Sequence, residues 1–346
     1  NSTGGRRPQM YSLKSDVMYI VAVSMDQLVT RVAILDMQNN FAFPIENFEL
    51  TLANNPKSLN QLLDLLKKYI QKSGIAKNKI VGIGIGMPGF VDVKKSINNT
   101  YLKPARGNVV SELESELGVP VFIDNDSSLV ALAELKFCKA LNRKNSMVIN
   151  IGWGVGLGMI LNGELFRGNN GFAGEFSHIP IFTNNKICGC GKSGCLETET
   201  SLLVIIDKAI KGIKEGKSTS LKDISMDHPE AAAHSIIEAA LHGDSFSIDL
   251  ITEVGYNIGR GVAILIHILN PELIVLSGRG SLAGRLWRAP IQQAINKLCI
   301  PKIAEDTTIE ISQMNYQAEI IGTACLVMDQ IDKRKFLLTH EKSLIS

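Results

Sequence analysis

The chain has 346 residues, of which 45% are hydrophobic and 20% are charged. Such a composition can bury sizeable cores, which excludes a mainly disordered chain, and the length suggests roughly two domains. Lys and Arg total 36 against 34 for Asp and Glu, so the net charge of +2 gives no strong field for nucleic acid. No apolar run approaches the ~18–20 residues of a membrane span, and the N-terminus lacks a signal sequence. We therefore expect a cytoplasmic protein with no membrane partner.

The spacing of apolar residues predicts two sets of alternating strands and helices, each opening with a hairpin. The first set is predicted as strands at 19–24, 30–36 and about 43–52, a helix at 56–72, a strand at 80–85, a helix at 109–117, a strand at 119–123 and a helix at 127–141. The second set is predicted as strands at 146–151 and 156–161, helices at 201–214, 230–241 and 245–269, a strand at 273–276, a helix at 282–297, a strand at 308–312 and a helix at 319–330. Two α/β units with mixed sheets and a cleft between them are therefore expected.

Metal-binding residue types gather in the segment 176–197, FSHIPIFTNNKICGCGKSGCLE. His178, Cys188, Cys190 and Cys195 supply one imidazole and three thiolates, a ligand set of tetrahedral zinc. The interleaved glycines let the backbone wrap tightly around an ion. Four protein ligands leave no open coordination position, so we expect a structural zinc; the alternatives are ordinary buried cysteines or a reactive thiol pair. The remaining cysteines lie in apolar helical contexts and are expected in the core: Cys138, Cys299 and Cys325.

Several segments together resemble the ROK family, which comprises repressors, uncharacterised open reading frames and sugar kinases. GFAGEFSHIP followed by CGCGKSGCLETETS resembles the zinc signature of that family, and VGIGIGMPGFVD resembles its glycine-proline substrate loop. FIDNDSSLVALAE resembles its Asn-Asp helix start, NIGWGVGLGMILNGELFRG its second hairpin, and NPELIVLSGRG its nucleotide-edge loop. The resemblance covers about residues 17–330, with the motifs in the order of the family.

The resemblance implies an α/β protein with the actin-like, ribonuclease H-like two-domain fold and an interdomain cleft that closes on a sugar. The expected divisions are a linker end over 1–16, an N-terminal α/β domain formed by 17–125 plus about 318–346, and a larger α/β domain with the zinc loop over 126–317. The final helix would cross back to the N-terminal domain.

A sugar site in that cleft is implied as well, with polar groups converging on the sugar hydroxyls. Asp126 matches the general base that takes a proton from the sugar hydroxyl in the kinases of the family. Asn125 precedes it, and either residue could instead simply cap the following helix. Gly89 would let the backbone approach the sugar, although a plain turn glycine would look the same.

The zinc signature contributes the other wall of the implied sugar pocket, with Glu175, His178 and Glu197 lining it. His178 would bind zinc through one ring nitrogen and a sugar hydroxyl through the other. The alternative for Glu175 and Glu197 is solvated surface charge.

The turns that hold ATP in the kinases of the family are altered in this chain. Those kinases carry an Asp-x-Gly-Gly-Thr turn whose glycine amides approach the phosphates and whose Asp helps to place magnesium. Residues 24–28 read SMDQL instead, and the Gly-Thr-Gly of the second hairpin reads GWG at 152–154. The metal-placing Asp, both glycines and two hydroxyls are lost, and Asp26 adds a negative charge. We therefore expect no ATP binding and no catalytic residue.

The segment GGRRP at 4–8 resembles the linker that follows the winged helix-turn-helix of ROK repressors, although a solvated basic tail is the alternative. We expect the effector-binding and oligomerisation region of a ROK transcriptional regulator that senses a sugar or sugar phosphate. It would control operator DNA through a domain not present in this chain, as a homodimer or homotetramer. The alternatives are an ATP-dependent hexose kinase, favoured by the intact Asn-Asp pair, and a sugar-binding module without a DNA partner.

Overall fold

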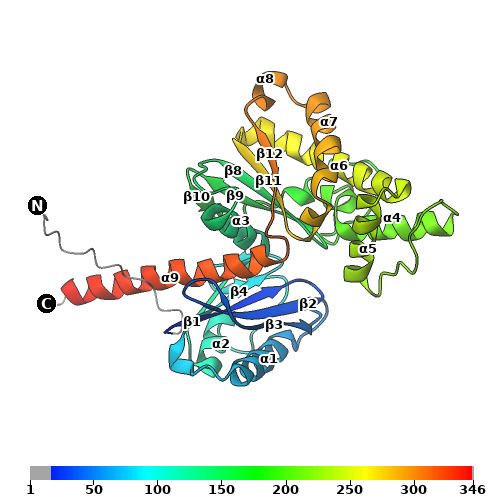
Figure 1. The fold of residues 1–346 in the computed structure, drawn as a ribbon. Coiled ribbons are helices and arrows are strands. Elements are labelled where there is room, and N and C mark those ends of the chain that lie inside the picture. Colours follow the sequence, from blue (N-terminus) through cyan, green and yellow to red (C-terminus); the bar gives the residue numbers. More distant parts are fainter. Residues whose placement is uncertain (1–16, 345–346) are drawn as a thin grey trace, which may run out of the picture.

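The computed structural model describes residues 17–344, which contain two five-stranded mixed sheets (Figure 1). The predicted linker end at 1–16 lies outside the described residues. The strand order of the first sheet is β3 (Phe41–Glu49), β2 (Val29–Asp36), β1 (Tyr19–Met25), β4 (Ile80–Met87) and β7 (Val121–Asn125). The strand order of the second is β10 (Glu164–Phe166), β9 (Val155–Leu161), β8 (Ser146–Ile151), β11 (Leu273–Ser277) and β12 (Thr308–Ile311).

The two sheets share one topology. In each, three strands pair antiparallel in a meander, β1-β2-β3 and β8-β9-β10. Two further strands then extend the sheet in parallel from the first strand of that meander, β4-β7 in one sheet and β11-β12 in the other. Because parallel neighbours need a crossover connection, helices must follow those strands, as the alternating apolar patterns predict.

Helices α1 (Ser58–Ser73) and α2 (Val109–Leu117) cover one face of the first sheet. Leu62 and Leu66 of α1 and Leu113 of α2 are fully buried there against strand residues such as Val21 and Ile83. Burial of each such side chain stabilises the fold by about 1.5–3 kcal/mol. The sixteen-residue α1 ends at Gly74, whose left-handed backbone (φ 68°) suits glycine.

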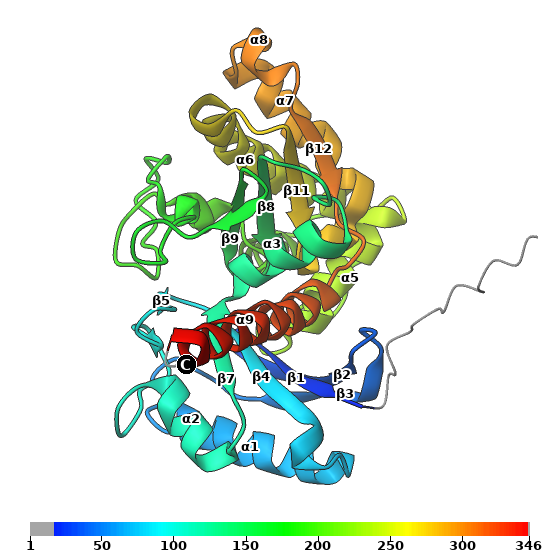
Figure 2. The same cartoon turned by 90° about the vertical axis from the view of Figure 1, so that its left-hand side faces the viewer.

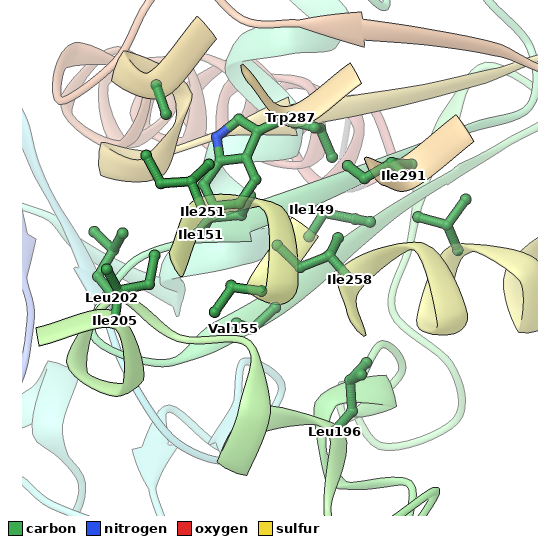
Figure 3. Close-up of a cluster of buried hydrophobic side chains, with 14 of the residues drawn as sticks. Ile149, Ile151, Val155, Leu196, Leu202, Ile205, Ile251, Ile258, Trp287 and Ile291 are labelled. Carbon is green, nitrogen blue, oxygen red and sulfur yellow. The ribbon is translucent and has the colours of Figure 1, made fainter. Parts of the chain in front are cut away.

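The second half has a larger core, around which four helices gather: α4 (Leu202–Lys214), α5 (Pro229–Leu241), α6 (Ser245–Leu269) and α7 (Arg288–Leu298). Figure 3 shows part of this core, in which Trp287 lies among side chains from β8 and α6. The indole nitrogen of Trp287 is buried and donates to the carbonyl of Gly280 at 2.7 Å, so its burial leaves no polar group unpaired.

Between the sheets lie α3 (Asp126–Phe137) and α9 (Gln317–Leu344), side by side (Figures 1 and 2). Alternate glycines on β4 face α9: a Cβ atom on Gly84 would lie 2.6 Å from the carbonyl oxygen of Thr323. Glycines on β9 face α3 in the same way, and a Cβ atom on Gly158 would lie 2.6 Å from the carbonyl oxygen of Ser127. The glycine-rich strands therefore let each helix approach its sheet closely.

Two predicted helices are corrected by the structure. The single helix predicted at 282–297 is wrong, because a 3₁₀ segment, Arg279–Trp287, breaks at Gly284 (φ 54°, ψ −125°) before α7 begins. The helix predicted at 127–141 ends at Phe137, where Cys138 leaves helical geometry. Cys138 is also only half-buried, whereas Cys299 and Cys325 are buried as predicted.

Several short elements were not predicted from the sequence: β5 (Val91–Asp92), β6 (Ile97–Asn98), β10, α8 (Pro301–Ala304), and the 3₁₀ turns Lys77–Lys79, Phe176–His178 and Leu196–Glu199. Each spans at most four residues, too few for an apolar period to repeat often enough to be recognised. Among residues 17–344, no helix combines the length and the apolar character needed to cross a membrane.

Candidate functional site

A cleft of about 350 Å³ opens between the two halves of the molecule. Its lining includes every residue predicted to bind sugar, and these come from both halves: Gly89, Asn125, Asp126, Glu175, His178 and Glu197. The structure thus brings together residues that are up to about a hundred positions apart in the chain.

Asn125 both caps a helix and ties the cleft wall together. Its Oδ1 accepts hydrogen bonds from the backbone amides of Ser127 and Ser128, at 3.0 and 3.2 Å. Its Nδ2 donates to the carbonyl oxygen of Gly89 at 3.3 Å. Gly89 has φ 86°, and a Cβ atom there would lie 2.6 Å from Oγ1 of Thr100, so only glycine fits. Asn125 therefore caps the helix and lines the cleft at the same time, two positions that the sequence left compatible.

Asp126 is the first residue of α3 and faces the cleft. Its Oδ1 accepts hydrogen bonds from the backbone amide of Ser127 at 2.7 Å and from the hydroxyl of Ser127 at 3.2 Å. Burial, helped by the nearby carboxylates of Glu175 and Asp26 and opposed by the hydrogen bonds from Ser127, raises the pKa of Asp126 to about 6. At neutral pH Asp126 is therefore mainly an ionised hydrogen-bond acceptor.

The four predicted metal ligands lie together beside the cleft. Nδ1 of His178 is 3.5 Å from Sγ of Cys188, and Sγ of Cys190 is 3.6 Å from Sγ of Cys195. One donor atom from each residue lies within 4.8 Å of all the others. Tetrahedral zinc with Zn–S of about 2.3 Å and Zn–N of about 2.0 Å places neighbouring ligand atoms about 3.5–3.8 Å apart. The donor set therefore fits a metal ion held by all four residues.

Tight turns shape the loop that carries the three thiols. The backbone amide of Gly191 donates to the carbonyl of Cys188 at 2.9 Å, and the amide of Cys188 donates to the carbonyl of Lys192 at 2.8 Å. Gly194 has φ 75°, and a Cβ atom there would lie 2.0 Å from the carbonyl oxygen of Phe182. Gly191 (φ 83°) and Gly194 therefore adopt a left-handed backbone that favours glycine, whereas the backbone at Gly189 does not require it.

His178 and Glu197 connect the thiol cluster to the cleft. Nε2 of His178, the ring nitrogen opposite the thiols, lies 3.6 Å from Oε2 of Glu175. Oε2 of Glu197 accepts from the backbone amide of Val155 at 3.2 Å, while its Oε1 lies 3.6 Å from Sγ of Cys188. The side chain of Glu175 is 40% exposed, so this carboxylate is solvated as well as cleft-lining.

An ion pair that sequence reasoning missed spans the cleft at the first hairpin turn. Oδ1 of Asp26 accepts from the backbone amides of Leu28 and Val29, both at 2.8 Å, and Oδ2 accepts from Nη2 of Arg279 at 2.5 Å. Arg279 is buried, donates through Nε to Glu230 at 3.1 Å, and lies 4.8 Å from the ring centre of Trp153. Asp26 is therefore a paired charge, joined to the far half of the protein.

Other cleft residues with no local sequence signal come from α9 and β2. Oε1 of Glu319 is buried and has no hydrogen-bond partner among the described residues. Burial, together with the charge of Asp126, raises the pKa of Glu319 to about 8. Arg31 lies with its guanidinium 5.3 Å from the ring centre of Tyr316 and 3.7 Å from Oε2 of Glu230. Only the fold brings these groups to the cleft.

Comparison with known proteins gives these features a family. The ROK family model matches residues 45–330. The glucokinase of Halalkalibacterium halodurans is 32% identical over 272 residues, covering 78% of this chain and 82% of its own, and the xylose repressor of Caldicellulosiruptor bescii is 29% identical over 336 residues, covering 95% and 83%. The crystal structure of a ROK family transcriptional regulator, a homolog of the Escherichia coli MLC protein, superposes with a TM-score of 0.78 at 26% identity, covering 91% of this chain and 78% of that one.

These matches agree with the repeated sheet topology and confirm the predicted fold, the actin-like arrangement of two mixed sheets. The family contains both sugar kinases and sugar-responsive repressors, and relatives of each kind resemble this chain. The chain belongs to the ROK family.

Proposed function

We propose that this chain is the effector-binding and oligomerisation region of a ROK transcriptional regulator that senses a sugar in its cleft. The proposed sugar ligands are Gly89, Asn125, Asp126, Glu175, His178 and Glu197. The similarity to the xylose repressor, which extends over 95% of this chain, supports this proposal. We further propose a domain of 17–125 with about 318–346, and a second domain of 126–317 that holds structural zinc.

One observation carries the choice of regulator over kinase: the ion pair between Asp26 and Arg279. Phosphoryl transfer needs amides and cations that hold a triphosphate and its magnesium. At this turn Asp26 already accepts from the amides of Leu28 and Val29, and Arg279 is already paired with two carboxylates. A triphosphate would have to displace these contacts and would meet the charge of Asp26.

A kinase remains the second candidate, because the glucokinase relative is 32% identical and Asp126 lies in the cleft as a base would. With magnesium-ATP and a sugar that binds, we expect no significant release of ADP in a coupled assay. The reason is that a general base is useful only when a phosphoryl donor is aligned with it. Turnover in the usual kinase range of ~1–100 s⁻¹ would overturn the regulator proposal.

Sugar binding itself should depend on the carboxylate of Asp126. The Asp126→Asn change should weaken the binding of the sugar by about 1–3 kcal/mol, because a charge-assisted hydrogen bond becomes a neutral one. Calorimetry measures the loss. Asp36→Asn is the matched control, because Asp36 also accepts backbone hydrogen bonds but lies at the C-terminal end of β2, outside the lining of the cleft. Equal affinity for the sugar in the two variants would show that Asp126 is not a sugar ligand.

The proposed regulation follows from the position of the cleft between the two halves. A sugar held by residues from both halves favours a closed arrangement, and closure would change the relative placement of DNA-binding heads. A palindromic operator requires two heads related by a two-fold axis, so the proposed assembly is a homodimer or homotetramer.

A further inference from the structure

The charges that line the cleft restrict the chemistry of its ligand. We propose that the effector is an uncharged sugar and that the cleft excludes phosphorylated sugars, an inference that rests on the proposed function of the cleft as a sugar site. Five acidic side chains line the cavity of about 350 Å³: Asp26, Asp126, Glu175, Glu197 and Glu319. Because burial raises the pKa of Glu319 to about 8, that side chain is mainly protonated at neutral pH, and the charge argument rests on the other four.

Each cationic side chain in the described lining of the cleft already has a carboxylate neighbour. Arg279 is paired with Asp26 at 2.5 Å and with Glu230 at 3.1 Å. Arg31 lies 3.7 Å from the same Glu230. Because a buried phosphate needs a cation or several donors of its own, these arginines would have to give up existing partners to bind one.

The ring of His178 offers no better site for a phosphate. Its Nδ1 faces the thiol of Cys188 at 3.5 Å, and its Nε2 faces Oε2 of Glu175 at 3.6 Å. A phosphate placed near Nε2 would therefore also lie near the carboxylate of Glu175, and like charges repel strongly where water is partly excluded.

Four backbone amides at the two turns where an anion could bind already have acceptors within the protein. The start of a helix is a common phosphate site, but at α3 the amides of Ser127 and Ser128 already donate to the side chains of Asn125 and Asp126. In the glycine turn after β8, the amide of Gly152 donates to the carbonyl of Gly154, and that of Val155 donates to Glu197. These donors serve the protein's own acceptors.

Sugar hydroxyls suit the same cleft. A hydroxyl both donates and accepts, so it can donate to a carboxylate such as Asp126 or Glu175 and accept from a neutral donor. Tyr101, Asn150 and Asn315 also line the cavity and supply neutral polar groups. A phosphate dianion is mainly an acceptor, so the carboxylates that would bind hydroxyls would repel it.

Calorimetry on the wild-type chain tests the inference with matched pairs: glucose and glucose 6-phosphate, xylose and xylose 5-phosphate, and N-acetylglucosamine and its 6-phosphate. For the sugar that binds most tightly, we expect its phosphate to bind roughly tenfold or more weakly. A phosphate that binds as tightly as its parent sugar, or more tightly, would overturn the inference and leave the sugar-sensing proposal standing. Binding of no member of the panel would overturn both.

A variant pair tests whether charge is the cause. Asp26→Asn removes one carboxylate from the lining and frees Nη2 of Arg279 from its ion pair with Asp26. It should therefore reduce the ratio of sugar affinity to sugar phosphate affinity. Asp36→Asn makes the same change in the next turn of the same sheet, away from the cleft, and should leave the ratio unchanged. An unchanged ratio in folded Asp26→Asn protein, checked by thermal unfolding, would contradict the charge argument.

Discussion

Replacement of Cys190 by serine should reduce zinc in the purified protein from about one ion per chain to a small fraction of that. The four donor atoms lie within 4.8 Å of one another, so each loss removes a quarter of a closed coordination sphere. Because binding energy at such a site is also folding energy, the variant should melt at a lower temperature, by about 2–4 °C for each kcal/mol lost. Elemental analysis after a chelator wash and a thermal scan measure the two effects.

Cys299→Ser provides the control for loss of a buried thiol, because Cys299 is buried and lies outside the cluster. It should lower stability without changing the zinc content. Near-zero metal in the wild-type chain, with the same melting temperature before and after chelation, would show that the four residues form an ordinary thiol cluster.

The Cys190→Ser change should also weaken sugar binding, although Cys190 is not one of the proposed sugar ligands. His178 is both a proposed zinc ligand and a proposed sugar ligand, since its Nδ1 faces the thiols and its Nε2 faces Glu175. Loss of the metal would release the ring from its orientation, and supporting interactions of this kind commonly change affinity by about 10–100-fold. The Cys299→Ser control should bind sugar normally.

Much of the fold follows from apolar spacing alone. Long helices such as α6 and the buried strands β4 and β11 were predicted within a few residues, because their patterns persist over one or more helical turns or a whole strand. The break at Gly284 was missed because apolar residues continue at helical spacing on both sides of it. Spacing records which side chains are buried and does not record the backbone angle between them.

The proposed site divides in the same way. Residues from Asp126 to Glu197 were found because they belong to recognisable segments, and the fold brings them together around one cleft. Asp26 was predicted to place a negative charge at the phosphate turn, but its ion-pair partner Arg279, which lies 253 positions further along the chain, was not predicted. Glu319 was missed for a related reason: its burial depends on the packing of α9 between the sheets. Contacts between residues so far apart in the chain form only when the whole chain has folded.

Among the glycines of the described residues, Gly322, at the contact between α3 and α9, should tolerate an added Cβ atom least. A Cβ atom on Gly322 would lie 1.9 Å from the carbonyl oxygen of Leu129 and 2.5 Å from its carbon, whereas real Cβ atoms essentially never approach closer than 3.0 Å. Both atoms belong to the backbone of α3, so no rotamer change can relieve the clash. The two helices would have to separate by roughly 1 Å.

Gly322→Ala should therefore lower the free energy of unfolding by about 2 kcal/mol or more, even though alanine gains about 1 kcal/mol of helix propensity. Gly212→Ala is the matched control inside another helix, because the three atoms nearest to its Cβ atom would all belong to the ring of Phe246, a side chain, and not to backbone. That change should be nearly neutral in chemical denaturation. Equal losses in the two variants would show that crowding against a side chain costs as much as crowding against the backbone. Because α3 begins at Asp126 and α9 carries Glu319, separation of these helices should also weaken sugar binding in the Gly322 variant alone.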